Sequence, residues 1–200
     1  MHDQHQEFFD RLAAEWDLTF TSEDFERLAH LVTNLTVKSG WRVLDLGCGT
    51  GILFDLLRRR VGETGMVVGV DFSIEMAELA HRNFPFKNVN VVDADASMLP
   101  FQESCFDMAV AFSAFPHFSD QQRALDEAHR VLKPGASFHL IHLMSSKEIA
   151  DVHRKVGGVV AHDTLPTVEK LSRMFAQSRF ANVAIEDHPG LYIASATNAK

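Results

Sequence analysis

The chain is poor in cysteine and has no long apolar segment. Its 200 residues include only two cysteines, Cys48 and Cys105, which are too few for a disulfide framework, so we expect a reducing compartment, the cytoplasm. No apolar run approaches the roughly 20 residues that span a bilayer. Residues 1–7 lack the basic and then apolar pattern of a secretory signal. We therefore expect neither a membrane span nor a secretory leader.

Positive charge is also scarce. The 19 Lys and Arg residues are outnumbered by 27 Asp and Glu residues, which gives a net charge of -8. Nucleic acid is not expected as a partner, because phosphate binding needs clustered Lys and Arg. The densest basic run, residues 58–60, follows an apolar helical stretch and is interpreted as the last turn of a helix. The chain contains no repeat and no Pro/Gly/Ser-rich linker, so we predict a single domain over residues 1–200.

Short apolar runs typical of buried strands alternate with helical segments from residue 42 onward. Strands are predicted at 42–46, 66–70, 88–92, 106–112 and 137–143, with helices near 52–57, 74–82 and 120–132, a turn at 133–135, and a capping box at 145–148. A helical cap is predicted over 1–38, and two extended runs around a Pro-Gly turn, 183–186 and 191–197, predict an antiparallel hairpin. This order predicts an α/β fold with a doubly wound, mostly parallel sheet covered by helices on both faces.

Ligands of such sheets bind at the carboxyl ends of the strands, which makes the loops after the strands the candidate site. The first loop reads Asp45-Leu46-Gly47-Cys48-Gly49-Thr50-Gly51. Its glycines allow a tight turn and the close approach of a ligand, although a structural turn without a ligand is the alternative. Their spacing departs from the G-x-G-x-x-G of dinucleotide-binding proteins, and the Gly-Lys-Ser/Thr of a P-loop is absent.

Acidic residues follow the second and third predicted strands. Asp71 is placed to accept hydrogen bonds from ribose hydroxyls, or else to cap the next helix, as Ser73 can equally do. Asp95, in the third loop, is a candidate acceptor for an adenine amino group. The three loops together predict a nucleoside-binding crevice.

These segments resemble the class I S-adenosylmethionine-dependent methyltransferases, in the branch that includes ubiquinone/menaquinone-type enzymes (methyltransferase type 11). The residues that carry the resemblance are Val43–Gly51 for the first motif, Val68–Ser73 for the acidic second-strand loop, Asp95-Ala96 with Leu99-Pro100-Phe101 for the "DAxxLPF" segment, Phe106-Asp107 for the fourth strand and Arg130–Gly135 for the turn before strand five. The resemblance covers roughly residues 40–143, the expected cofactor-binding core. Residues 144–200 remain as a substrate-side insertion and the hairpin.

The resemblance implies a Rossmann-like, seven-stranded sheet with an antiparallel C-terminal strand. It implies S-adenosylmethionine as cofactor and methyl transfer to a small-molecule acceptor. The implied cofactor-binding residues are Asp45, Gly47, Cys48, Gly49 and Gly51 for the methionyl part, Asp71 for the ribose, Asp95 and Ala96 for the adenine, Phe72 and Met76 beside the adenosine, and Phe112 beside the sulfonium. Two alternatives stay open: a protein that binds S-adenosylmethionine as a partner or sensor without catalysis, and an NAD-dependent oxidoreductase, which the glycine spacing disfavours.

The acceptor site is less well marked in the sequence. Phe8, Phe9 and Trp16 either close the pocket or belong to an amphipathic helix that packs on the sheet. No Asn/Asp-Pro-Pro-Tyr/Phe follows the fourth strand, so methylation of amino groups in DNA is not expected. The acceptor atom and the oligomeric state stay open.

Eleven histidines are present, and four lie near the ends of the fourth and fifth strands. His117 follows the fourth strand, His142 lies near the end of the fifth, and His153 and His162 come after it. Strand alternation places His139 on the face opposite His142. Three interpretations of the four compete: packed or surface side chains, a general base with substrate contacts, or a metal site. No short spacing such as H-x-x-x-H supports the metal site.

Overall fold

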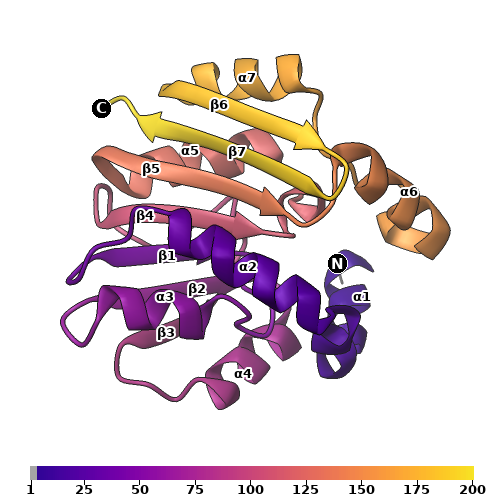
Figure 1. Cartoon of the computed structure of the whole chain (residues 1–200), viewed down its shortest axis with the longest axis horizontal. Coiled ribbons are helices and arrows are strands. Elements are labelled where there is room, and N and C mark those ends of the chain that lie inside the picture. Colours follow the sequence, from indigo (N-terminus) through magenta and orange to yellow (C-terminus); the bar gives the residue numbers. More distant parts are fainter. Residues whose placement is uncertain (1–3) are drawn as a thin grey trace.

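Seven strands form a single sheet in the order β3-β2-β1-β4-β5-β7-β6 (Figure 1). This computed structural model describes residues 4–200, so residues 1–3 of the predicted helical cap lie outside the described residues. The strands are β1 (Arg42–Leu46), β2 (Met66–Asp71), β3 (Val89–Asp93), β4 (Phe106–Phe112), β5 (Leu132–His142), β6 (Phe180–His188) and β7 (Leu191–Asn198). Strand β7 is antiparallel to both of its neighbours, whereas β1 to β5 pair in parallel. The predicted mostly parallel sheet with an antiparallel C-terminal strand is confirmed.

Helices cover both faces of the sheet. One face packs against α2 (Ser22–Asn34) and α3 (Phe54–Val61), and α4 (Ile74–Asn83) packs against β2 and β3. The other face packs against α5 (Gln121–Val131) and α7 (Val168–Gln177). The central strands are almost entirely buried, which explains why they read as continuous apolar runs rather than as alternating patterns.

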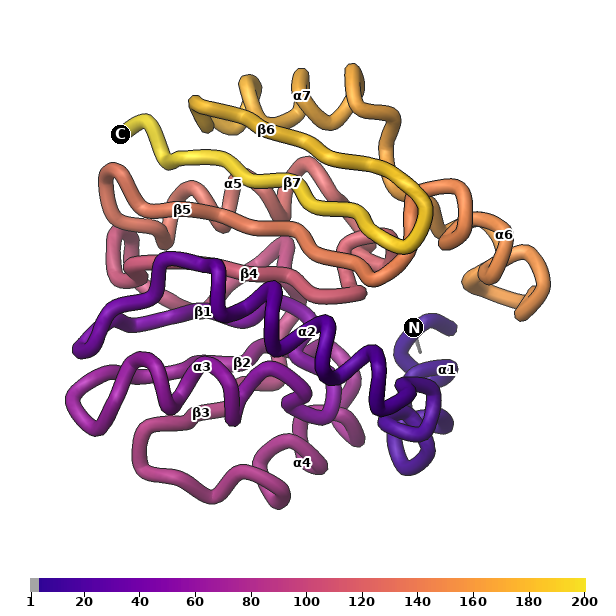
Figure 2. Tube along the Cα trace, in the orientation of Figure 1, coloured from indigo at the N-terminus to yellow at the C-terminus, as the bar shows by residue number. Residues whose placement is uncertain are grey.

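The N-terminal segment lies beside the carboxyl ends of the strands rather than flat on the sheet (Figure 2). It comprises α1 (Gln4–Leu12) and the short 3-10 helix η1 (Ala13–Thr19), and it contacts α4 and the 3-10 helix η3 (Gly158–His162). Helix α2 begins with a capping box in which Thr21 and Asp24 satisfy each other's backbone N–H groups. The cap therefore divides into a helix on the sheet and a segment over the strand ends.

Strand β5 begins earlier than predicted. The expected turn at 133–135 lies inside β5, because Leu132 already pairs with Phe106 and the register then shifts before Ser137 pairs with Met108. Gly135, with a φ of 76°, lies in this irregular stretch. The Pro-Gly pair therefore produces a bulge in the strand instead of ending it.

The insertion after β5 begins where the capping box predicted. Helix α6 (Ser146–Val156) starts after Ser145, whose hydroxyl accepts from the Glu148 backbone N–H while the Glu148 carboxylate accepts from the Ser145 backbone N–H. Figure 1 shows α6 projecting beyond the sheet, above the N-terminal segment. The insertion and the N-terminus thus meet over the carboxyl ends of the strands.

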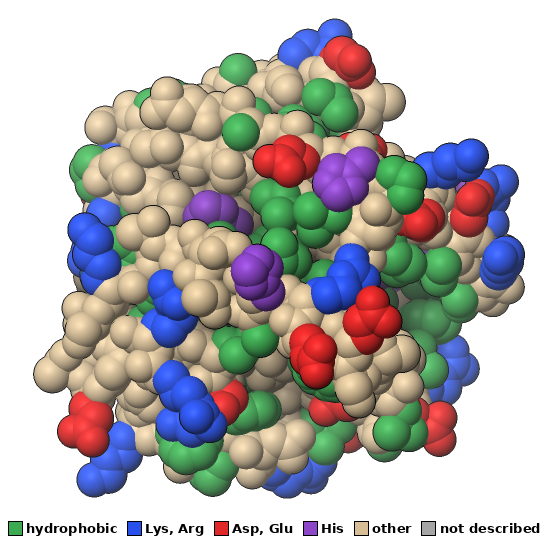
Figure 3. All heavy atoms as spheres, in the orientation of Figure 1, with side chains coloured by type: hydrophobic (Ala, Val, Ile, Leu, Met, Phe, Trp, Pro, Cys, Tyr) green, Lys and Arg blue, Asp and Glu red, His purple; other side chains and the backbone are tan. Residues whose placement is uncertain are grey.

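Charges of both signs are scattered over the face that α2 covers. Figure 3 shows the Lys and Arg side chains spread around this face and interspersed with Asp and Glu. In the part of the chain that the structure describes, no helix combines the length and the apolarity that crossing a bilayer requires.

Candidate functional site

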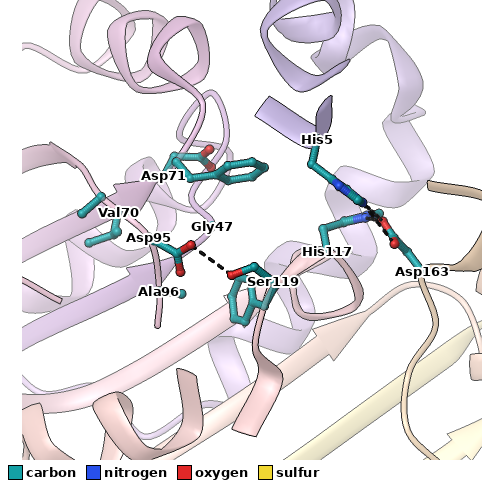
Figure 4. Close-up of a pocket in the computed structure, with 12 residues that line it drawn as sticks. His5, Gly47, Val70, Asp71, Asp95, Ala96, His117, Ser119 and Asp163 are labelled. Carbon is teal, nitrogen blue, oxygen red and sulfur yellow. Dashed lines mark hydrogen bonds and ion pairs between the residues drawn. The ribbon is translucent and has the colours of Figure 1, made fainter. Parts of the chain in front are cut away.

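A cavity of about 170 Å³ opens at the carboxyl ends of β1, β2 and β4, where the strand order reverses (Figure 4). A smaller cavity of about 50 Å³ shares five of its lining residues: Gly47, Asp71, Phe72, His117 and Phe118. Together the two cavities are lined by most of the predicted cofactor-binding residues: Gly47, Cys48, Gly49, Asp71, Phe72, Met76, Asp95, Ala96 and Phe112. The three loops therefore converge as the sequence predicted.

The glycine loop turns sharply between β1 and α3. Gly47 has a φ of 69°, and a Cβ there would lie 2.3 Å from the Cβ of Ala114. The backbone N–H groups of Gly47 and Cys48 donate to the Val70 carbonyl, which ties the loop to the end of β2. Gly51 lies behind the cavity, where a Cβ would clash with Phe54. Gly47 therefore lies at the cavity, whereas Gly51 lines neither cavity and is required for packing against Phe54.

Asp71 joins the first and second loops. One of its carboxylate oxygens accepts from the Gly49 N–H at 2.8 Å and the other from the Ser73 N–H at 3.0 Å. Burial raises the pKa of Asp71 to about 6, although these N–H donors partly offset the effect. Ser73 caps α4 by accepting from the Met76 N–H, so capping does not require Asp71. Asp71 is therefore free to hold a ligand at the cavity wall.

Asp45 lies beneath the glycine loop and does not line either cavity. Its side chain is 1% exposed, and among the described residues neither carboxylate oxygen has a hydrogen-bond partner. Burial, reinforced by the nearby Asp71, raises the pKa of Asp45 to about 8. An unpartnered buried carboxyl group is costly, so Asp45 is an exception to the usual pairing of buried polar groups.

The third loop places a carboxylate at the opposite wall from the histidines. Asp95 accepts from the Ser97 N–H at 2.7 Å and from the Ser119 hydroxyl at 3.1 Å, as Figure 4 shows for the latter. The Ala94 N–H donates to the Asp71 carbonyl, which fixes this loop against β2. Asp95 and Ala96 thus lie beside Asp71 along one cavity.

The N-terminal segment covers the crevice through polar anchors. Asp10 accepts from the Ser73 hydroxyl at 2.6 Å and from the Glu75 N–H at 3.3 Å, at the start of α4. Asp17 accepts from the Thr50 hydroxyl in the glycine loop. These anchors hold α1 and η1 directly on the two loops that form the cavities.

Six of the fifteen residues that line the smaller cavity are aromatic. They are Phe9, Trp16, Phe20, Phe72, Phe112 and Phe118. Phe9 contacts both Trp16 and Phe72 edge-on, with ring centroids 5.8 Å apart in each pair. Of the three N-terminal aromatic residues that the sequence suggested, Phe9 and Trp16 close the cavity, whereas Phe8 packs against Phe9 behind it.

Three of the four candidate histidines lie near one another, but only one of the four lines the cavities. His117 and His153 are in contact, with ring centroids 4.8 Å apart, and His117 lines both cavities. His142 is 3% exposed and packs edge-on against Tyr192, and its burial, reinforced by His117 and His153, lowers its pKa to about 3. His162 is exposed on the surface. Within residues 4–200, no group of three or more His, Cys, Asp or Glu side chains is arranged to hold a metal ion.

Three acidic residues were not predicted from the sequence: Asp163 at the cavity, and Asp10 and Asp17 in the N-terminal segment that covers it. Asp163 accepts a hydrogen bond from His117 at 2.7 Å and interacts with His5 of α1 at 3.2 Å (Figure 4). Asp10 and Asp17 anchor the N-terminal segment. These residues carry no local signal, because their partners lie 33 or more positions away in the sequence.

A family model described as a methyltransferase domain matches residues 44–140. A 2-phytyl-1,4-naphtoquinone methyltransferase of Nostoc punctiforme is 46% identical over 50% of this chain, and the chain spans 45% of that protein's length in the match. A demethylmenaquinone methyltransferase of Staphylococcus saprophyticus is 29% identical over 94% of this chain and 92% of its own length.

Solved structures of methyltransferases share the fold. A SAM-dependent methyltransferase of Thermotoga maritima superposes with a TM-score of 0.76 and 21% identity, over 98% of this chain and all of that one. A SAM-dependent methyltransferase of Aquifex aeolicus gives a TM-score of 0.70 and 22% identity, over 97% and 98% of the two chains. The glycine loop, the acidic residues at the strand ends and these comparisons agree: the chain belongs to the class I S-adenosylmethionine-dependent methyltransferases, enzymes that take their methyl group from that cofactor.

Proposed function

We propose that this enzyme methylates a small, flat, hydroxylated aromatic ring of the quinol type. The observation that carries the proposal is the aromatic wall of the smaller cavity, which adjoins the glycine loop and the Asp71 carboxylate. Flat apolar rings pack well against aromatic side chains in stacked or edge-on arrangements. The two relatives compared above are named for methylation of naphthoquinone and menaquinone rings, which supports the same class of acceptor.

The residues present fit the cofactor. Asp71 would accept from the ribose hydroxyls, Asp95 and Ala96 would hold the adenine, and Phe72 and Met76 would flank the adenosine. The buried, unpartnered Asp45 carboxyl group lies under the loop that would hold the methionyl part, where a cationic ammonium group would lower the cost of its ionisation. Aromatic faces such as Phe112 favour a positively charged sulfonium beside them. When bound, S-adenosylmethionine supplies an electrophilic methyl carbon.

The chain's own contribution is to orient the acceptor and to exclude water. The wall made by Phe9, Trp16 and Phe20 comes from the N-terminal segment, and Phe112 and Phe118 come from the end of β4 and the loop after it. A ring held between these two walls has few orientations, and alignment of a nucleophile with its target accounts for a large part of such catalysis. Among the described residues, the lining of this cavity holds no Lys or Arg side chain that would pair with an anionic acceptor.

The experiment is a measurement of S-adenosylhomocysteine release from the purified protein with three acceptors. A reduced 1,4-naphthoquinol that lacks the ring methyl group is expected to turn over, whereas histamine, as a cationic amine, and a guanidinium acceptor are not. The naphthoquinol's oxidised quinone is the matched control, because it has the same shape without ring hydroxyls. Turnover with an amine and not with the quinol would overturn the proposed acceptor class. Binding of cofactor with no turnover for any acceptor would favour the non-catalytic alternative.

We also propose a cytoplasmic location. Cys48 and Cys105 are free thiols, with Cys48 buried beside the glycine loop. Free thiols at a functional loop are compatible with a reducing compartment. Thiol titration of protein taken from cells without reductant checks this, and a disulfide between two chains through Cys105 would contradict it.

A further inference from the structure

His117 and Asp163 form a close pair at the cavity. The distance between Nδ1 of His117 and one Oδ of Asp163 is 2.7 Å, and the two side chains are only 10% and 14% exposed. His117 ends the 3-10 helix η2 (Phe115–His117), directly after β4, whereas Asp163 follows η3 in the insertion after β5. The pair exists only because the insertion folds back over the strand ends.

The surroundings hold the His117 ring in one orientation. Phe9 contacts it edge-on with ring centroids 4.9 Å apart, and His153 packs on it at 4.8 Å. His153 is itself fixed, since its Nδ1 donates to the Asp163 backbone carbonyl at 2.6 Å. Asp163 therefore positions two imidazoles, one through its carboxylate and the other through its backbone.

This hydrogen bond determines which nitrogen of His117 can accept a proton. A neutral imidazole whose Nδ1–H donates to a carboxylate carries its free lone pair on Nε2. Because His117 lines both cavities, the ring lies between the cofactor loops and the aromatic wall. The arrangement is that of a base oriented by a carboxylate, in which the carboxylate also stabilises the imidazolium that forms.

We propose that His117 is the proton acceptor for the acceptor's ring hydroxyl and that Asp163 is its positioning residue. This proposal rests on the proposed function. The hydroxyl O–H bond breaks, an Nε2–H bond forms on His117, and the electron pair stays on the ring oxygen, from which it enriches the ring in electrons. The imidazolium is paired with the Asp163 carboxylate and later releases the proton to water.

The titratable groups around His117 are consistent with a neutral base at physiological pH. Burial lowers the pKa of His117, and the hydrogen bond to Asp163 partly offsets this while His153 and His5 add to the lowering. For Asp163 burial acts to raise the pKa, but the bonds from His117 and His5 prevail and lower it. His142 is a poorer candidate, because it lies buried behind this group and lines neither cavity.

The first test needs no turnover. Nitrogen-15 NMR of histidine-labelled, cofactor-free protein is expected to show neutral His117 with its proton on Nδ1. In Asp163→Asn this tautomer loses its preference, and the His117 pKa falls further because the offsetting carboxylate is gone. Asp151→Asn, a half-exposed acidic residue on α6, is the matched control and should leave the His117 signals unchanged. A wild-type proton on Nε2 would overturn the proposal, since that nitrogen could then not accept another.

The second test is kinetic. His117→Gln should lower kcat about 100-fold or more, within the range expected for loss of a general base. Asp163→Asn should lower kcat by roughly tenfold or more and shift the acid limb of the kcat–pH profile. Both variants should keep the S-adenosylmethionine dissociation constant within about twofold, and the exposed His162→Gln should behave as wild type. An unchanged kcat in His117→Gln would overturn the proposal. Absence of turnover in the wild type would instead count against the proposed function. The NMR result would still show whether Asp163 fixes the tautomer of His117.

Discussion

We expect Asp71 to couple cofactor binding to pH. Its pKa of about 6 in the cofactor-free protein means that the carboxylate is ionised at pH 7.5 and mostly protonated at pH 5. A ribose hydroxyl donates a stronger hydrogen bond to the ionised form. We therefore expect the contribution of Asp71 to S-adenosylmethionine affinity to be fully present above about pH 7 and to fall as the pH drops through 6, by up to roughly tenfold per pH unit.

Calorimetric titrations between pH 5 and 8 measure this dependence. Asp71→Asn is expected to bind more weakly at pH 7.5 and to lose the pH dependence, because the amide does not titrate in this range. Glu78→Gln is a suitable control, since Glu78 is an exposed residue of α4. A wild-type affinity that does not change between pH 7.5 and 5 would contradict the role of the ionised Asp71 carboxylate.

Single residues were predictable where a local rule specifies them. Gly47 needs a positive φ and has no room for a Cβ, and Ser145 with Glu148 forms the predicted capping box. The histidines show the limit of such rules. Nothing local distinguishes His117, which lines the cavities, from His162, which is exposed, because the difference arises from how the insertion folds back.

At the scale of elements, the segment α1–η1 acts as a cover for the crevice. The cavity of about 170 Å³ is smaller than the roughly 300–1,000 Å³ of typical small-molecule sites. Cofactor and acceptor together need more room, so we expect the cover to shift when they enter. Its polar anchors among the described residues are small in number: Asp10 on Ser73 and Glu75, Asp17 on Thr50, and His5 on Asp163.

Asp10→Ala tests this cover. The variant loses the hydrogen bonds to the start of α4, each contributing about 0.5–1.5 kcal/mol. We expect faster amide hydrogen exchange over residues 4–19, because the segment then opens more easily. Glu7→Ala changes an exposed residue of the same helix and serves as the control. Unchanged exchange in Asp10→Ala would show that Asp10 does not anchor the segment.

Regular elements were predicted better than irregular ones. Strands β1 and β4 match their predicted bounds, because each is a buried apolar run between polar turns. Helix α7 was not predicted although a signal exists: Leu171, Met174 and Phe175 recur at helical spacing and are buried. The 3-10 helices η2 and η3 offer no such periodicity, since each is a single short turn held by tertiary contacts.

At the scale of the whole molecule, the site has two halves: the convergence of the strand-end loops was predictable, and the meeting of the N-terminal segment with the insertion was not. The first half consists of loops that follow consecutive strands, and the parallel sheet brings these loops together automatically. The second half joins α1, η2 and η3, which lie far apart in the sequence and meet only through packing. The contact of His117 with Asp163, 46 positions apart, is of this second kind.

Because the cofactor crevice joins the N-terminal segment to both halves of the sheet, a bound ligand should stabilise the whole chain. Ligand at 100 times its dissociation constant adds about 2.7 kcal/mol, which shifts the melting temperature of a domain of this size by roughly 5–11 °C. We expect S-adenosylhomocysteine to produce such a shift in thermal melts and NAD to leave the melting temperature within about 1 °C, because the glycine spacing and the crevice suit a nucleoside thioether rather than a pyrophosphate. In Asp71→Ala the shift at the same ligand concentration should shrink. Stabilisation by NAD and not by S-adenosylhomocysteine would mean that the crevice serves a dinucleotide, and the assignment of the three loops would then be wrong.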